Sequence, residues 1–313
     1  MIEVKNVTKK YGKFIPIDNI NFTINDGEII GLLGPNGAGK STTMNMITGF
    51  IEATEGTIIV NGYNILTNAK KAKKEIGYMP EGVPLYQDLT VKEFVTYMAE
   101  LRKVDKKKKK EYVQNAIKNV GIDNVQNKLI RNLSRGYKQR VSMAGALVGE
   151  PKILILDEPT VGLDPEQVKE IRELIKQLGK THTVILSSHI LSEVSQICNK
   201  VIIINKGKIL AIDTPENLEK ANEKEDIIYV TVEDSENKME KVVKDKITEI
   251  KEIKLVETND DKTKKYAITG DKSDLRKKLF EILAKEGITI FEMKKSESSL
   301  EDAFIKIIKK EDK

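Results

Sequence analysis

The feature that most constrains this chain is an eight-residue stretch, Gly34–Ser41, which reads Gly-Pro-Asn-Gly-Ala-Gly-Lys-Ser. It fits G-x-x-x-x-G-K-[ST], the pattern of a phosphate-binding loop between a strand and a helix. The apolar run Ile29–Leu33 before it predicts a buried strand, and a helical apolar pattern that stops at Gly49 follows it. The flanking segments therefore favour a phosphate-binding loop over a glycine-rich turn without a ligand.

The residue types in this stretch explain how it would hold a nucleotide. Glycines let the backbone turn tightly, so that consecutive N–H groups face one anion, and the following helix start adds partial positive charge. Lys40 would reach the β- and γ-phosphates, and the Ser41 hydroxyl would hold Mg²⁺. The expected nucleotide-binding residues are Gly34, Pro35, Asn36, Gly37, Ala38, Gly39, Lys40, Ser41 and Thr42.

Composition limits the class of protein. A length of 313 residues indicates about two domains. The net charge of +5 is modest for this length and does not argue for a nucleic-acid partner. A single cysteine, Cys198, excludes an intrachain disulfide and favours a reducing cytosol. It lies in a helical pattern, where a small buried side chain is expected.

The sequence predicts neither a membrane-spanning helix nor a signal peptide. No apolar run approaches the roughly 18 residues that a spanning helix needs. The N-terminus alternates like a strand, which is not a signal-peptide pattern. We therefore expect a cytoplasmic protein that acts at a membrane only by docking on other subunits.

The residues up to position 150 change from strand-like to helical patterns. Alternating apolar residues predict strands in 1–33, where Tyr11 is either a half-buried turn residue or a flat ring stacked on adenine. Residues 85–150 keep helical spacing, and Ser134 stands at the start of one helix. The five lysines Lys106–Lys110 fit a solvated helix start, with contact to anionic lipid headgroups as the alternative.

A pair of carboxylates follows the most apolar segment of the chain. Ile153–Leu156 predicts a strand buried on both faces of a parallel sheet. Asp157 and Glu158 stand at its carboxyl end, where ligands of such sheets bind. Asp157 would hold Mg²⁺, and Glu158 could polarise a water for attack on the γ-phosphate. A polar strand end before Pro159 is the alternative interpretation.

The last part of the chain has a different composition. A polar segment near residue 220 indicates a linker. Residues 226–313 alternate strand and helix patterns, and a helix-start motif, [ST]-x-x-[DE], begins at Ser299. A turn is expected at 259–261. We therefore expect two domains, 1–220 and 226–313, the second a small α+β domain without a catalytic constellation.

Further motifs in the same order resemble the ATP-binding subunits of ABC transporters. Leu133–Arg140, which reads Leu-Ser-Arg-Gly-Tyr-Lys-Gln-Arg, resembles the family signature segment, usually Leu-Ser-Gly-Gly-Gln. Val161–Asp164 is similar to the D-loop, and Ser188-His189 to the switch histidine. Tyr11 matches the adenine-stacking aromatic residue. The similarity covers roughly residues 1–220.

This resemblance implies a fold and an activity. The fold is α/β: a P-loop NTPase core with a parallel sheet, an antiparallel β subdomain and an inserted helical subdomain at about 85–150, plus the C-terminal α+β domain. The activity is ATP hydrolysis with Mg²⁺ at the interface of a head-to-tail homodimer or heterodimer. The implied site residues are Glu158 and His189 for catalysis, Ser41, Glu81 and Asp157 for Mg²⁺, Asp164 in the D-loop, and Ser134 and Gly136 for the other protomer's ATP. His182 is expected to be structural.

Two departures from the family pattern stand out. Glu81 replaces the usual glutamine, and Arg135 and Tyr137 replace a glycine and a glutamine of the signature. The variant signature is similar to that of single-cassette exporter ATPases of the drug, sodium or gliding-associated type. The resemblance then implies integral-membrane permease partners, no nucleic acid, and a location on the inner face of the cell membrane. The alternatives are a soluble ATP switch acting on a ribosome or DNA and an inactive regulatory module.

Overall fold

The computed structural model describes residues 1–82, 85–188, 190–222, 226–234, 238–259, 263–270, 275–295 and 300–311. Three sequence predictions fall wholly or partly outside these residues: the switch His189, the helix-start Ser299 and the 259–261 turn. The chain forms two compact units, Met1–Glu216 with Ile307–Lys313, and Asn217–Lys306. Each unit is described by itself.

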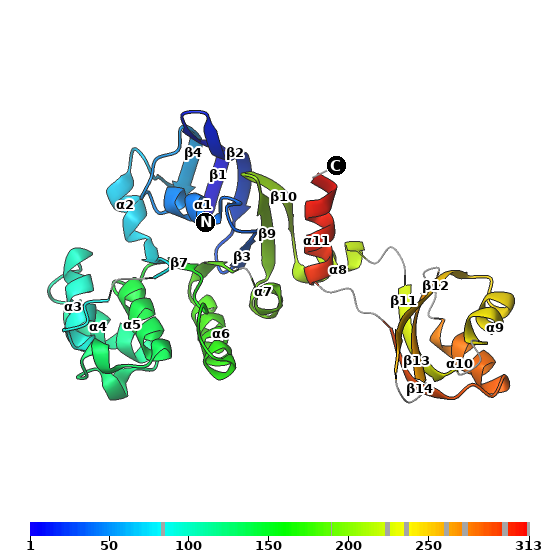
Figure 1. Cartoon of the computed structure of the whole chain (residues 1–313). Coiled ribbons are helices and arrows are strands. Elements are labelled where there is room, and N and C mark those ends of the chain that lie inside the picture. The colour runs from blue at the N-terminus through cyan, green and yellow to red at the C-terminus, as the bar shows by residue number, and fades with distance from the viewer. Residues whose placement is uncertain are drawn as a thin grey trace. The chain divides into compact units, whose positions relative to one another are not determined.

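A six-stranded sheet lies at the centre of the first unit, with the strand order β10-β9-β3-β8-β7-β6 (Figure 1). Its strands pair in parallel except for edge strand β10, which is antiparallel to β9. Every residue of β3, β7 and β8 is buried, as their continuous apolar runs predict. The strands are β3 (Ile29–Leu33), β6 (Ile76–Met79), β7 (Ile153–Asp157), β8 (Thr183–Ser187), β9 (Lys200–Asn205) and β10 (Lys208–Asp213).

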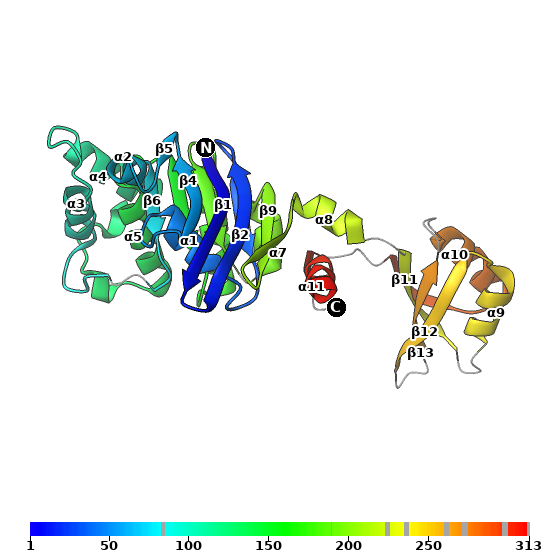
Figure 2. The same cartoon turned by 90° about the horizontal axis from the view of Figure 1, so that it is seen from above.

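The N-terminal strands form a second, antiparallel sheet with the order β2-β1-β4-β5 (Figure 2). Tyr11 is the last residue of β1 and pairs with Phe14, so the turn consists of Gly12 and Lys13. Tyr11 therefore does not lie in the turn, as one interpretation expected. Its pairing with Phe14 extends β1 by one residue, up to the turn. The strands are β1 (Ile2–Tyr11), β2 (Phe14–Ile24), β4 (Glu55–Val60) and β5 (Tyr63–Asn64).

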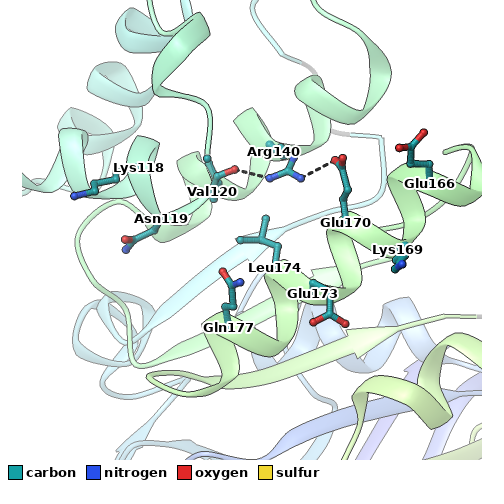
Figure 3. A pocket seen from close by; sticks show the side chains of 11 residues that line it. Lys118, Asn119, Val120, Arg140, Glu166, Lys169, Glu170, Glu173, Leu174 and Gln177 are labelled. Carbon is teal, nitrogen blue, oxygen red and sulfur yellow. Dashed lines mark hydrogen bonds and ion pairs between the residues drawn. The ribbon is translucent and has the colours of Figure 1, made fainter.

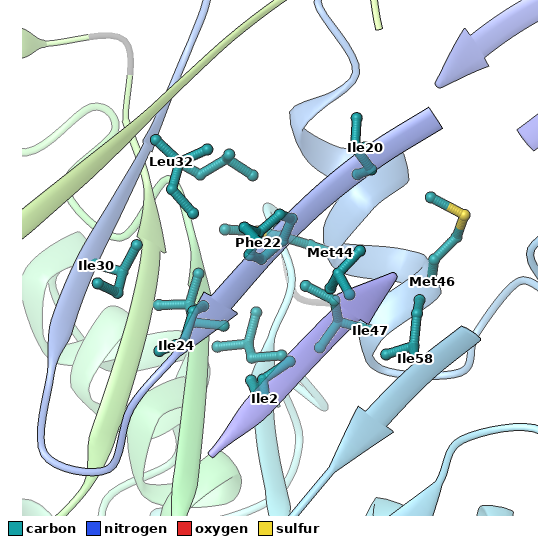
Figure 4. Packing of buried hydrophobic residues seen from close by; sticks show 14 of the residues in the cluster. Ile2, Ile20, Phe22, Ile24, Ile30, Leu32, Met44, Met46, Ile47 and Ile58 are labelled. Atoms are coloured by element: carbon teal, nitrogen blue, oxygen red, sulfur yellow. The ribbon is translucent and has the colours of Figure 1, made fainter. Parts of the chain in front are cut away.

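The main core lies around α1 (Lys40–Ile47), which contacts strands of both sheets (Figure 1). Met44 and Ile47 of this helix pack with apolar side chains of β1, β2 and β4 (Figure 4). Full burial of each such side chain contributes about 1.5–3 kcal/mol. Helices α6 (Pro165–Gly179) and α7 (Leu191–Ile197) pack on β8 and β3 respectively. The core thus fixes the start of α1 against the sheet.

Residues 85–150 are helical, as predicted. Thr90 and Glu93 form a reciprocal capping box at the start of the first helix of this region. The lysine run spans a turn and the start of α4, which begins at Lys109. The helices are α3 (Val91–Leu101), α4 (Lys109–Asn119), α5 (Arg135–Leu147) and the 3₁₀ helices η1 (Asp123–Val125) and η2 (Ile130–Asn132). A short helix, α2 (Ala69–Lys74), precedes β6.

Arg140 links this helical region to the sheet-packing helix α6. Its guanidinium donates to the Val120 carbonyl oxygen at 2.8 Å and to Glu170 Oε2 at 2.9 Å (Figure 3). The ion pair reaches across a hollow of about 600 Å³ that Leu174 also lines. Because Glu170 is more than half exposed, this ion pair contributes only about 0.2–1 kcal/mol. Arg140 therefore helps to fix α5, and with it Ser134, relative to α6.

His182 and Cys198 lie beside β8 and α7 respectively. His182 immediately precedes β8, and its Nδ1 lies 2.8 Å from the Pro151 carbonyl oxygen. Cys198 follows α7 rather than lying within it, and burial raises the pKa of its thiol. A buried thiol with a raised pKa is a poor nucleophile. Cys198 is therefore buried, as predicted, although it lies just after the helix and not within it.

The second unit has an antiparallel sheet with the order β12-β13-β11-β14. Two helices contribute Met239, Val243, Leu279 and Leu283 to its core, together with apolar residues of the strands. The elements are β11 (Asp226–Glu233), α9 (Met239–Lys246), β12 (Ile250–Thr258), β13 (Thr263–Gly270), α10 (Arg276–Lys285) and β14 (Ile290–Lys295). The remaining helices of the chain are α8 (Pro215–Asn222) and α11 (Leu300–Glu311).

Candidate functional site

The loop between β3 and α1 has the backbone that its glycines permit. Gly37 and Gly39 have φ angles of 79° and 111°, in the left-handed region that favours glycine. A Cβ at Gly39 would lie 2.5 Å from Ile17 Cδ1 and 2.9 Å from the Pro16 carbonyl oxygen. Because β2 approaches so closely, this position has no room for a side chain. The loop is therefore held against β2 in the turn that precedes the start of α1.

Lys40 is the first residue of α1 and is 8% exposed. Its Nζ donates to the carbonyl oxygens of Gly34 at 2.7 Å and Pro35 at 3.2 Å. Burial lowers the pKa of this ammonium, and three carboxylates oppose the shift: Glu158, Asp157 and Glu81. The structure thus brings Lys40 within electrostatic reach of all three predicted acidic residues.

The Asp157 carboxylate is positioned by a buried hydroxyl. Ser187 Oγ donates to Asp157 Oδ1 and accepts from the Glu158 backbone N–H at 2.9 Å. Ser187 is fully buried, and Asp157 is 4% exposed. Ser187 belongs to none of the sequence motifs. A signal was present, because Ser187 ends the next buried strand and is the parallel register partner of Asp157.

Glu158 has an unusual backbone conformation. Its φ of 48° lies in the left-handed region, which is uncommon for a residue with a side chain. Such a conformation costs about 1–3 kcal/mol and persists only where surrounding contacts fix it. Here the bond from its N–H to Ser187 and the buried side chain, 9% exposed, provide that support. Strain of this kind concentrates at functional sites.

The signature and D-loop segments contact one another within the chain. Ser134 caps α5, since its hydroxyl accepts from the Tyr137 N–H at 3.4 Å. A Cβ at Gly136 would lie 3.0 Å from Gln167 Oε1, and Asp164 caps α6 by accepting from the Gln167 N–H at 2.9 Å. Both helix starts therefore converge on Gln167.

Arg135, one of the two departures in the signature, has a clear neighbour. A Cβ at Gly162 of the D-loop would lie 2.3 Å from the Arg135 guanidinium carbon. The guanidinium therefore lies directly against the Gly162 backbone, and φ at Gly162 is 69°. Arg135, which replaces a glycine of the signature, thus fills the space beside Gly162. Gly136 still packs closely against Gln167.

Two further bonds tie the segment after Glu158 to its surroundings. Gln139 of α5 donates to the Pro159 carbonyl oxygen at 2.7 Å. Thr160 donates to Glu193 of α7 at 2.6 Å, and both of these side chains are buried. The segment between Glu158 and Asp164 is therefore held from two sides, by the signature helix and by the helix that follows β8.

The predicted adenine-stacking residue presents an accessible ring. Tyr11 is 52% exposed, and Lys9 Nζ lies 4.8 Å from the centre of its ring. The residues predicted to bind Mg²⁺ carry oxygen atoms. Ser41 is exposed in the first turn of α1, and the negative charges of Asp157 and Glu81 raise the pKa of Lys40 against the effect of burial. No cluster of three histidine, cysteine or carboxylate residues suited to a metal occurs among the described residues. This donor set suits Mg²⁺, which binds one or two carboxylates together with substrate phosphates.

Comparison with known proteins agrees with this geometry. The ABC transporter family matches residues 17–161. The bacitracin transport ATP-binding protein of Bacillus licheniformis is 35% identical over 98% of this chain and 97% of its own length. The chain belongs to the ATP-binding proteins of ABC transporters.

Further matches support the family and its fold. The linearmycin resistance ATP-binding protein of Bacillus subtilis is 38% identical over 74% of this chain and 75% of its own length. A dimeric ATP-binding cassette in a post-hydrolysis state, bound to ADP and phosphate, has a TM-score of 0.61 and 26% identity. That match covers 68% of this chain and 98% of the solved one.

Family membership confirms several of the predictions. The protein is an ABC-type ATPase that binds ATP, and the α/β P-loop fold expected from the sequence is correct. Cassettes of this family work as dimers with membrane permeases. These relatives support the transporter interpretation over the ribosome-acting alternative. Within the described part of the chain, none of the helices is both long and apolar enough to span a bilayer.

Proposed function

We propose that this protein hydrolyses ATP–Mg²⁺ at the interface of a dimer and thereby drives export through separate membrane subunits. The observation that carries the proposal is the Lys40 ammonium, buried beside the loop and within electrostatic reach of Asp157, Glu158 and Glu81. A buried cation next to carboxylates at strand ends matches the charge pattern of a phosphate–metal complex. The transport and resistance functions in the names of the two relatives support export.

The proposed ATP contacts follow from the loop. Backbone N–H groups at the start of α1 and the Lys40 ammonium would bind phosphate oxygens, and the Tyr11 ring would stack on adenine. On phosphate binding, Lys40 Nζ would exchange its carbonyl partners for a charged one, which is the stronger bond. The proposed contacts are Tyr11, Gly34, Pro35, Asn36, Gly37, Ala38, Gly39, Lys40, Ser41 and Thr42.

We assign hydrolysis to Glu158 and Mg²⁺ binding to Ser41, Asp157 and Glu81. Bound Mg²⁺ neutralises charge on the β- and γ-phosphates. Glu158 would accept a proton from the attacking water. The proposed switch residue His189 lies outside the described residues, so its assignment comes from the sequence alone.

We further propose that the second half of each ATP site comes from another protomer. Ser134 and Gly136 stand at a helix start, where free N–H groups favour an anion. Asp164 and the signature share contacts with Gln167, so the D-loop and the signature would move as one piece. Arg135 would preserve this unit by packing on Gly162. Homodimer and heterodimer both fit this arrangement.

The permease would dock on the helical region near residues 81–100. A mostly apolar groove of about 440 Å³ lies there, lined by Tyr86, Leu89 and Tyr97 among others. Tyr86 is 53% exposed, and its ring contacts the Tyr97 ring edge-on, with 5.4 Å between the ring centres. Exposed aromatic residues in a groove are typical of protein interfaces. This docking would place the protein on the inner face of the cell membrane.

We propose that residues 1–220 are the nucleotide-binding domain, with the helical subdomain at about 85–150. Residues 226–313 would be an accessory domain. The bacitracin transport relative matches 98% of this chain, and the match therefore includes this region. The compact unit Asn217–Lys306 supports a separate domain, with bounds several residues from those expected.

Replacement of Ser187 with alanine tests how the carboxylates are positioned. The change removes the donor to Asp157 and the acceptor for the Glu158 N–H, so we expect a loss of about 1–3 kcal/mol in unfolding free energy. We also expect the Mg²⁺ concentration for half-maximal turnover to rise. Mg²⁺ titration of the ATPase measures this, with Ser192→Ala, which changes an exposed serine of α7, as the matched control. An unchanged Mg²⁺ dependence would remove Ser187 from a positioning role.

Purification from native membranes tests the transporter function. Tagged Glu158→Gln protein should bind ATP without turnover and therefore retain its partners. We expect it to recover a stoichiometric multi-span membrane protein from detergent-solubilised membranes in the presence of ATP and Mg²⁺. The Lys40→Ala variant, treated identically, should recover less of it. Recovery of ribosomes or of soluble partners only would contradict the proposal.

A further inference from the structure

A pocket near the amino end of β6 has an unusual lining. It lies where α2 and the α3–α4 connection meet, near Lys74, which precedes the amino end of β6. Its volume is about 640 Å³. Six of its eleven lining residues are basic: Lys70, Lys73, Lys74, Arg102, Lys103 and Lys108. These six residues define what we call the basic pocket.

The charge of the basic pocket is largely uncompensated. One lining residue is acidic, Asp105, and its Oδ1 already accepts from the Lys107 N–H at 2.8 Å. Across the described residues, Lys70, Lys73 and Lys74 form no ion pair with a carboxylate. So many like charges in one hollow repel each other, which a bound anion would relieve.

Arg102 supplies a fixed guanidinium in this pocket. Its Nη2 donates to the carbonyl oxygens of Ile76 at 2.8 Å and Lys74 at 3.3 Å. Burial lowers the pKa of this guanidinium, and no described carboxylate lies within ion-pair distance. An arginine held in place by two carbonyls keeps its other N–H groups for a planar or tetrahedral oxyanion. The site therefore has a rigid donor as well as mobile lysines.

Apolar side chains border the charged lining. Leu101 is 58% exposed at the end of α3, although its helical spacing predicts burial, and Val104 and Tyr112 also line the pocket. An exposed leucine beside several lysines suits a ligand with both a charged and an apolar part.

We propose that the basic pocket binds the phosphate group of an anionic ligand. The phosphate would bind Arg102 and the lysines of α2. Two sources share this chemistry, an anionic phospholipid headgroup and a soluble phosphate compound. The site is distinct from the nucleotide loop, and its occupancy does not depend on the proposed export function.

The test uses the full chain with Lys70, Lys73 and Lys74 all changed to glutamine, which keeps helix propensity and removes three charges. Flotation with phosphatidylcholine vesicles, with and without phosphatidylglycerol, measures lipid binding. We expect the native chain to bind only the anionic vesicles. The triple variant should bind them about a hundredfold more weakly, since each lysine near such a surface contributes about a factor of five.

The lysine run supplies a matched control. Lys106, Lys107 and Lys110 are exposed, and they do not line the pocket. Changing these three to glutamine alters the net charge equally and should leave vesicle binding within about threefold of the native value, through long-range charge alone. Equal losses in the two triple variants would overturn the proposal, because they would indicate binding through diffuse charge.

A second arm of the test distinguishes the soluble source. Pyrophosphate binding is measured calorimetrically in a Lys40→Ala background, so that the nucleotide loop does not dominate the signal. Binding of pyrophosphate that the α2 triple change abolishes, without any vesicle binding, would support a soluble phosphate ligand. Absence of binding to both probes would overturn the basic pocket as an anion site. ATP turnover of the triple variant in the native background reports that the chain is folded.

Discussion

Replacement of Glu158 with glutamine is expected to lower ATP turnover by about 10²–10⁴-fold while ATP still binds. Glutamine keeps the shape and burial of the side chain but cannot accept a proton from the attacking water. The bond to Ser187 is made by the Glu158 backbone N–H, and glutamine fills the same buried volume, so the backbone conformation at φ 48° should persist. Single-turnover ATPase measurements and equilibrium nucleotide binding separate the two effects.

This variant should also trap a dimer. If two protomers enclose ATP, slow hydrolysis keeps the complex closed, and size-exclusion chromatography with ATP and Mg²⁺ should show twice the native mass. A useful control is Glu166→Gln, an exposed residue in the first turn of α6, which should retain native turnover. Near-native turnover of Glu158→Gln would remove Glu158 from the catalytic role.

Replacement of Lys40 with alanine is expected to weaken ATP binding by about 2–3 kcal/mol, roughly 30–150-fold in affinity. The ammonium is desolvated in the protein, since burial lowers its pKa, and it donates to two backbone carbonyl oxygens. A phosphate offers it a fully charged partner. The loss should therefore be larger for ATP than for adenosine, which lacks phosphates.

Fluorescence titration with a nucleotide analogue and calorimetry with adenosine measure these two affinities. Lys106→Ala, which removes one exposed charge from the lysine run, is the matched control and should bind ATP normally. Unchanged ATP affinity in Lys40→Ala would contradict the assignment of this loop to phosphate. An equal loss for adenosine would instead indicate a distorted loop.

Much of the fold could be predicted because its signals are local. Four apolar residues in a row predict β7, and the glycines of the loop between β3 and α1 predict a tight turn. Helical spacing predicts α3 and α4. Leu101 keeps the helical spacing of α3, yet its side chain is exposed at the end of the helix. The spacing of apolar residues indicates which face of a helix is apolar. It does not indicate how far along the helix other elements cover that face.

The residues expected to bind phosphate and Mg²⁺ and to support hydrolysis can be read from the sequence alone. Lys40, Asp157 and Glu158 were identified from their patterns, since glycine geometry and buried strands leave strong periodic signals. It did not determine which of them meet. The folded chain alone brings three carboxylates within electrostatic reach of Lys40, Ser187 beside Asp157, and Arg135 against Gly162. Those contacts join residues far apart in the chain, and their distances depend on how strands order within the sheet.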